Sequence, residues 1–210
     1  MPKSPSTPTP PRLRIAEPMP LKRRQTAHRI TSAAQQLAVE KGYDEFTLDE
    51  LAERAGVSRR TLFNYFDGKL EATIGGGPQL RQSDIDTFLA GGPTGEFIDD
   101  VAALVLGILR ASPELERSRT EWRTLRRCFE TNPKLMIAAH EAFAGFVEGV
   151  QELLEQRSGI PAGDPEPRLL VALFGAVFDV SMTEFTASDD DRDLAAVFLE
   201  NLAIARRIFH

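Results

Sequence analysis

The chain has 210 residues, a formal net charge of −6 and 42% hydrophobic residues, enough to build a sizeable core. Its longest apolar run, 169–178, is far shorter than the roughly 20 residues of a membrane-spanning helix, which excludes a typical helical membrane protein. The single cysteine, Cys128, excludes an intramolecular disulfide and is typical of a reducing compartment. Because the amino terminus is polar and proline-rich, it does not resemble a secretory signal, and we expect a cytoplasmic protein without a membrane partner.

The charge is distributed unevenly along the chain. Residues 1–72 carry a net charge of +3, whereas residues 73–210 carry −9. DNA phosphates repel an acidic surface, so only the amino-terminal part is expected to face nucleic acid.

Residues 1–20 contain seven of the fourteen prolines, and this composition predicts a disordered, basic tail. The basic residues of the tail continue into Lys22, Arg23 and Arg24. Two interpretations remain open: an arm that adds phosphate or minor-groove contacts, or a solvated tail that only aids solubility.

Three helices are predicted between residues 21 and 72. The first spans about 22–41 and ends at a glycine. Thr47 and Glu50 form a capping box for the second, and Ser58 caps the third. A turn around Gly56 joins the last two, which makes them a helix-turn-helix. Their apolar stripes are Leu48, Leu51, Ala52 and Ala55, then Leu62, Phe63 and Phe66.

After this unit the pattern becomes a helical body. A short helix at 69–74 is followed by Gly75-Gly76-Gly77-Pro78, a sequence that should end any helix. A further short helix is predicted at 80–89. Longer helices are predicted at about 95–111, 113–130, 133–157, 166–186 and 190–209, with Asp189-Asp190-Asp191 at the opening of the last. No strand alternation appears. The fold class is all-α, with a helix-turn-helix domain at 21–72 and a larger helical domain at 73–210.

The stretch AGVSRRTLFNYFDGK resembles the signature of the TetR family of bacterial transcriptional regulators. The resemblance covers about residues 22–72 and implies that double-stranded operator DNA is the partner. It also implies a small-molecule effector in the body. The chain departs from the family in its fourth helix, which is generally long in relatives and here is interrupted by glycines.

DNA contacts are expected on the third helix and near it. Arg59, Arg60 and Thr61 occupy the early positions from which base edges are reached. Phe63 stands where the family usually has a tyrosine, so Tyr65 is the better candidate for a phosphate contact. The resemblance also implies a phosphate contact for Lys69. The expected DNA-binding residues are Lys22, Arg23, Arg24, Thr47, Ser58, Arg59, Arg60, Thr61, Phe63, Asn64, Tyr65 and Lys69.

The two carboxy-terminal helices are candidates for a homodimer interface. The run 169–178 is apolar all round, and the last helix carries two apolar stripes, which is more than one core contact needs. Two such helices from each subunit can form a four-helix interface. The alternative is that both helices lie at the centre of a monomeric bundle.

The body also contains side chains suited to an apolar ligand pocket. The expected ligand-binding residues are Trp122, Arg126, Phe129, Met136, His140, Phe143, Phe174 and Phe178. Further side chains that could line the pocket are Leu125, Cys128, Phe146 and Val147. The alternative is that this aromatic stripe is simply core.

The sequence favours a regulator over an enzyme. It has no metal-ligand spacing, phosphate-binding loop or nucleophile motif, so we expect no cofactor and no metal; the aspartates at 189–193 are more simply a solvated helix start than a cation site. The first hypothesis is a ligand-responsive repressor that binds a pseudo-palindromic operator as a homodimer and is released by a small apolar or amphipathic effector. The alternatives are a DNA-binding regulator or architectural protein without an effector, and an enzyme or protein-interaction module.

Overall fold

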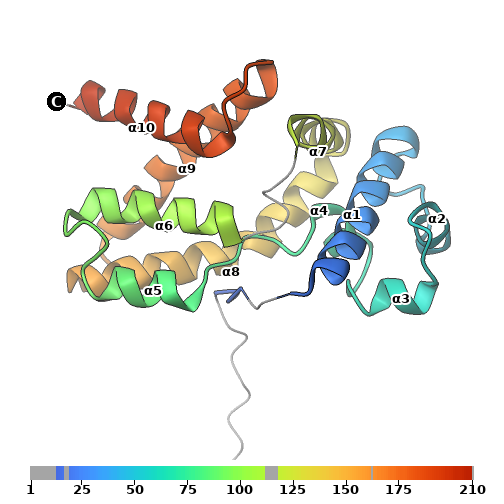
Figure 1. Cartoon of the computed structure of the whole chain (residues 1–210), viewed down its shortest axis with the longest axis horizontal. Helices are drawn as coiled ribbons and strands as arrows, with labels where there is room; N and C mark the ends of the chain where they lie inside the picture. Colours follow the sequence, from blue (N-terminus) through green and yellow to red (C-terminus); the bar gives the residue numbers. More distant parts are fainter. Residues whose placement is uncertain (1–12, 17–18, 112–117, 162, 210) are drawn as a thin grey trace, which may run out of the picture.

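The computed structural model describes residues 13–16, 19–111, 118–161 and 163–209, and over these residues the secondary structure is helical apart from one isolated β-bridge. A head, residues 19–74, and a body, residues 82–209, lie side by side (Figure 1). The helices are α1 (Leu21–Lys41), α2 (Leu48–Arg54), α3 (Arg59–Phe63), α4 (Lys69–Ile74), α5 (Gln82–Leu89), α6 (Phe97–Ala111), α7 (Arg119–Thr131), α8 (Pro133–Ser158), α9 (Pro165–Ala187) and α10 (Leu194–Phe209). The predicted all-α class is confirmed.

Local signals explain most of the helix ends. Pro133 and Pro165 stand at the first positions of α8 and α9, where a missing N–H costs nothing. Ser118 and Glu121 form a capping box for α7, whose expected beginning at Pro113 lies outside the described residues. Together these signals fix where three of the long helices begin.

The beginning predicted for the last helix is wrong. α10 starts at Leu194, with the Asp193 carboxylate accepting from the Ala196 amide at 2.7 Å. Asp189 and Asp190 lie in the preceding loop, where they pair with Arg123 at 2.7 Å and Arg119 at 3.3 Å. Arginines therefore neutralise these aspartates, and within the described part of the chain no group of three or more His, Cys, Asp or Glu side chains could hold a metal ion.

The head packs around α1, which crosses α2 and α4. Its buried core includes Ile30, Leu37, Phe46, Leu51 and Leu62. A buried hydrogen bond from the Gln35 side chain to the Thr73 carbonyl, 2.8 Å long, ties α1 to α4. Residues 75–81, which we call the linker, join α4 to α5. Their glycines end α4, as predicted, because Gly75 and Gly77 adopt positive φ angles of 84° and 79°.

The expectation of a disordered tail over residues 1–20 is wrong for residues 13–16. Ile15 forms a parallel bridge with Leu80, and the Ala16 amide donates to the Leu80 carbonyl at 2.7 Å. Residues 1–12, 17 and 18 of the tail lie outside the described residues. The segment 13–16 therefore belongs to the folded part of the chain.

α7 connects the head to the body. It packs against α1 on one side and against α8 and α9 on others. Cys128 of α7 and Leu135 of α8 are buried in the head's own core. Asn132, between these helices, accepts from the Tyr43 amide at 2.7 Å and donates to the Ala38 carbonyl at 3.3 Å. α7 and α8 thus contribute side chains to the core of the head.

Candidate DNA-binding surface and effector cavity

The helix-turn-helix forms as its caps predict. The Thr47 hydroxyl accepts from the Glu50 amide at 3.2 Å, and the Glu50 carboxylate accepts from the Thr47 amide at 2.8 Å. Gly56 makes the turn with a φ of 63°. The Ser58 hydroxyl then accepts from the Thr61 amide at 3.0 Å and caps α3.

α3 presents its polar residues to solvent at the outer end of the head (Figure 1). On the inner side of α3, Leu62 is fully buried, and α3 packs chiefly on α2. Phe63 departs from the predicted apolar stripe: it is 45% exposed, with the Arg59 guanidinium 5.8 Å from its ring centroid. The acidic body therefore does not cover the helix that was expected to read DNA.

The two arginines at the start of α3 differ in their surroundings. Both nitrogen–oxygen distances from Arg59 to the Asp49 carboxylate of α2 are short, at 3.0 and 2.9 Å. Arg60 is exposed, and none of the residues that the structure describes pairs with its guanidinium. The Arg60 guanidinium is therefore open to solvent, whereas the Arg59 guanidinium is engaged by Asp49.

The start of α1 lies beside the end of α3. The Arg23 guanidinium sits 5.4 Å from the Tyr65 ring centroid and donates to the Asn64 carbonyl at 3.5 Å. Lys22 is exposed next to it, and Arg24 is half-buried. The amino-terminal end of α1 therefore brings further basic side chains beside the end of α3.

Lys69 is turned into the head. Its ammonium donates to the Phe46 carbonyl at 2.5 Å and to the Asp44 carbonyl at 3.3 Å, and it lies 4.2 Å from the Phe46 ring centroid. Burial lowers the pKa of Lys69, although nearby carboxylates oppose this effect. In this arrangement Lys69 ties α4 to the chain before α2, which differs from the solvent-facing position that a phosphate contact needs.

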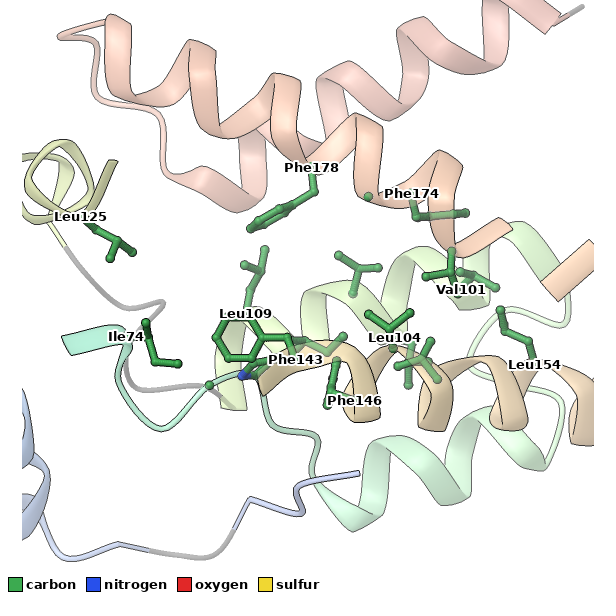
Figure 2. A pocket seen from close by; sticks show the side chains of 18 of the residues that line it. Ile74, Val101, Leu104, Leu109, Leu125, Phe143, Phe146, Leu154, Phe174 and Phe178 are labelled. Carbon is green, nitrogen blue, oxygen red and sulfur yellow. The ribbon is translucent and has the colours of Figure 1, made fainter. Parts of the chain in front are cut away.

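The body contains a partly open cavity of about 410 Å³ between α6, α7, α8 and α9. In Figure 2, Phe174 and Phe178 come from α9 on one side of the cavity and Phe143 and Phe146 from α8 on the other, and Ile74 lies at the end nearest the head. Every lining residue is apolar or glycine: Ile74, Gly77, Pro78, Val101, Leu104, Val105, Ile108, Leu109, Trp122, Leu125, Phe129, Phe143, Phe146, Val147, Val150, Leu154, Val171, Phe174, Gly175 and Phe178.

Of the predicted ligand-binding residues, the structure brings Trp122, Phe129, Phe143, Phe174 and Phe178 to this cavity. The other three, Arg126, Met136 and His140, do not line this cavity and are exposed. Arg126 pairs with Glu130 at 2.9 Å, while Met136 and His140 are exposed on α8. Cys128 belongs to the head's core instead, where burial raises the pKa of its thiol to about 11 and leaves it unreactive.

The sequence reading missed the contribution of α6 to the cavity. Val101, Leu104, Val105 and Ile108 recur at three- and four-residue spacing and so line one face of that helix. That apolar spacing was the signal that could have found them. The linker residues Gly77 and Pro78 carried no comparable signal.

α9 and α10 expose a large apolar surface. The exposed large side chains are Leu169, Leu173, Val180, Leu199, Ile204 and Ile208. By length and composition α9 could cross a membrane, and only 22% of its most apolar window is buried within the chain. The inner side of α9, however, packs against the rest of the protein: Ser181 is buried there and accepts a hydrogen bond from the Asn201 side chain of α10 at 3.3 Å. Among the residues that the structure describes, none therefore covers the outer side of this helix pair.

A basic helix-turn-helix head joined to a helical body is the architecture of a DNA-binding transcriptional regulator. Two family models match: "Bacterial regulatory proteins, tetR family" over residues 30–71, and "MftR C-terminal domain" over residues 97–209. The chain therefore belongs to the TetR family of transcriptional regulators.

Individual proteins agree with this assignment. The putative mycofactocin biosynthesis transcriptional regulator MftR of Mycobacterium tuberculosis is 27% identical over 70% of this chain and 73% of its own length. The uncharacterized regulator YvkB of Bacillus subtilis is 50% identical, but over only 22% of this chain and 24% of its own. The crystal structure of NalD, a repressor from Pseudomonas aeruginosa, shares the fold with a TM-score of 0.54 and 18% identity, over 89% of this chain and 96% of its own. These relatives are transcriptional regulators and not enzymes.

Proposed function

We propose that this chain is a ligand-responsive repressor that binds a pseudo-palindromic operator as a homodimer and is released by a small apolar or amphipathic effector. The observation that carries the proposal is the apolar cavity. Its wall includes the linker to the head and also α7, which packs against α1. A molecule in the cavity would therefore touch two of the segments that join the body to the head.

In the proposed complex, α3 enters the major groove. Arg60 and Thr61 face base edges, and Arg59 joins them once it leaves Asp49. Lys22, Arg23 and Tyr65 contact the flanking phosphates, which fix the register but carry no sequence information. This division follows from the exposure of the α3 start and from the position of Arg23 beside Tyr65.

The proposed partner for the apolar face of α9 and α10 is the same face of a second copy. A symmetric pair of these faces would make a four-helix interface and remove exposed apolar area from water. Twofold symmetry would also set two α3 helices at one fixed spacing, which an operator with two half-sites matches. The complex would act on the chromosome in the cytoplasm.

The proposed effector follows from the lining. Burying a polar group without a hydrogen bond costs roughly 1–3 kcal/mol, so an apolar wall rejects ligands that would place polar atoms against it. The cavity volume of about 410 Å³ falls within the usual range for small-molecule sites. Val147 and Gly175 line the cavity and are also exposed, so an amphipathic effector would keep its polar end on that side.

Release requires that the effector bind the free form more tightly than the DNA-bound form. The free energy by which it weakens DNA binding equals the free energy by which DNA weakens effector binding. Both affinities can therefore be measured as one linked quantity.

The test begins with genomic footprinting by the purified protein, which gives the operator and its symmetry. Fluorescence anisotropy with that operator then follows release by a library of apolar and amphipathic compounds. Val150→Trp fills the cavity from α8, and we expect it to bind the operator normally but to lose release by the effector. Ile137→Trp adds the same ring to an exposed position of the same helix and should respond like the wild type.

If no compound in a broad library releases or stabilises the protein, the alternative function is favoured: a DNA-binding regulator or architectural protein without an effector. The footprint also tests a narrower idea suggested by the similarity to MftR, that the sites lie beside genes for mycofactocin biosynthesis.

A further inference from the structure

The segment before α1 is bound to the linker between head and body. The Ala16 amide donates to the Leu80 carbonyl at 2.7 Å, and the Leu80 amide donates to the Arg14 carbonyl at 3.0 Å. Figure 1 shows this segment passing from the body toward α1. We refer to residues 13–16 as the strap.

Side chains of the strap hold both ends of the same linker. The Arg14 guanidinium donates to the Gly76 carbonyl and lies 3.4 Å from the Glu71 carboxylate of α4. Leu13 packs against the body core that contains the fully buried Leu80. The strap thus fastens residues 76–80 to α4 on one side and to the body on the other.

The linker is also part of the cavity wall. Ile74, Gly77 and Pro78 line the cavity, and a Cβ atom at Gly77 would lie only 2.7 Å from Cε1 of Phe143. The linker backbone therefore packs directly on a ring that lines the cavity. The same short segment is in contact with the cavity wall and with the strap.

We propose that the strap regulates the effector cavity by bracing the linker. An effector that displaces Phe143 or Pro78 must move the linker. Three hydrogen bonds to the strap, at Gly76 and Leu80, hold the linker in place, so effector binding is coupled to release of the strap. A chain with a released strap binds apolar molecules more tightly, since less of their binding free energy is spent on moving the linker. This inference rests on the proposed effector cavity and adds its regulation.

The first test removes one hydrogen-bond donor from the strap. Ala16→Pro deletes the N–H that bonds to Leu80, whereas Ala16→Ser keeps it and serves as the control. Hydrogen exchange of the full chain is followed at residues 76–80. One bond contributes about 0.5–1.5 kcal/mol, so we expect exchange there to rise several-fold, up to about tenfold, in Ala16→Pro alone. Arg14→Ala, which removes a different contact, should change exchange in the same direction.

The second test measures binding of N-phenyl-1-naphthylamine, an uncharged apolar fluorophore, to the same proteins. We expect its dissociation constant to fall several-fold in Ala16→Pro and in Arg14→Ala, and to be unchanged in Ala16→Ser. Thermal unfolding of each variant checks that the head and body remain folded.

Each remaining result is decisive. Unchanged exchange in both Ala16→Pro and Arg14→Ala would show that the strap does not brace the linker. Faster exchange with unchanged fluorophore affinity would overturn the coupling while leaving the cavity intact. If the fluorophore binds neither the wild type nor any variant, the proposed cavity function fails, and the regulation fails with it.

Discussion

At the scale of single residues, the ion pair between Asp49 and Arg59 bears on the proposed binding of α3 to DNA. Both side chains are exposed, with 69% and 56% of their surface in solvent. Such pairs contribute only about 0.2–1 kcal/mol, so the pair is a minor cost when Arg59 turns to DNA. In the proposed DNA complex, the larger effect of Asp49 would be to hold a negative charge beside the phosphates.

Asp49→Asn is expected to strengthen operator binding by up to about tenfold at low salt, because it frees Arg59 and removes a negative charge. Asp86→Asn removes an equal charge from α5 in the body and should have little effect. Anisotropy titrations at two salt concentrations would measure this. A decrease in affinity for Asp49→Asn would contradict the proposed role of Arg59.

Lys69 illustrates a residue whose place in the fold changes its expected role. Because its ammonium bonds to the Phe46 and Asp44 carbonyls, Lys69→Ala should lower thermal stability while the salt dependence of DNA binding stays the same. A true phosphate contact would lower the slope of log affinity against log salt by about one unit. Thermal unfolding and a salt titration of Lys69→Ala therefore separate the two roles, and a lowered slope would restore the phosphate contact.

The sequence predicts those residue contacts that are local in the chain. The caps at Thr47 and Ser58 were predictable because each side chain bonds to an amide three residues away. The positions of Lys69 and His140 were not, since each depends on how distant segments pack. The prediction that Phe63 belongs to an apolar stripe is wrong for a related reason. α3 ends within one and a half turns, so the side of α3 that carries Phe63 has no core to pack against.

At the scale of elements, a buried ion pair fixes α8 to the turn between α5 and α6. Asp100 of α6 is fully buried and pairs with Arg157 of α8, which also donates to the Phe88 and Gly92 carbonyls at 2.8 and 3.0 Å. Thr94 donates to the same carboxylate from its amide and its hydroxyl, both at 2.7 Å. The charge is satisfied, which is the condition for tolerating it in a core.

This pair predicts a pH dependence of stability. Burial acts to raise the pKa of Asp100, but the Thr94 hydrogen bonds and Arg157 outweigh it and hold the pKa at about 2. A free aspartate has a pKa of about 3.9, so the folded protein binds the proton less readily than the unfolded chain. The stabilisation from Asp100 is therefore complete above pH of about 4 and is lost as pH falls toward 2.

We expect Asp100→Asn to be less stable than the wild type at neutral pH and the difference to narrow below pH of about 4. Denaturant unfolding at pH values between 7 and about 2 would measure it. Asp86→Asn, at an exposed position of α5, is the control. A difference that stays constant across that range would mean that Asp100 does not titrate as proposed.

Helix positions were more predictable than what the helices enclose. Proline and glycine gave the ends of α4, α8 and α9 to within a residue or two, because these residues act on their own backbone. The cavity wall from α6 was missed because an apolar face looks the same whether it packs against a neighbour or borders an empty space. The bridge between the strap and Leu80 joins residues 65 positions apart, and no local pattern encodes it.

At the scale of the whole molecule, the apolar outer face of α9 and α10 is the feature that a single chain leaves unexplained. A monomer rarely keeps so many large apolar side chains in water. A second copy that covers this face would also give the two heads the fixed separation that a twofold operator demands. Both dimer assembly and operator recognition are therefore expected to depend on α9 and α10, although these two helices lie far from α3 (Figure 1).

Leu173→Glu places a charge in the middle of this face, and we expect it to convert a dimer into monomers of 23.2 kDa in sedimentation velocity. Ile137→Glu makes an equivalent exchange at an exposed position of α8 outside the face and should remain dimeric. Because each head alone contacts one half-site, Leu173→Glu should lose most of its operator affinity while its thermal unfolding still reports a folded head. If the wild type sediments as a monomer, or Leu173→Glu keeps the mass of a dimer, then α9 and α10 do not form the interface and the spacing of the two recognition helices must be set elsewhere.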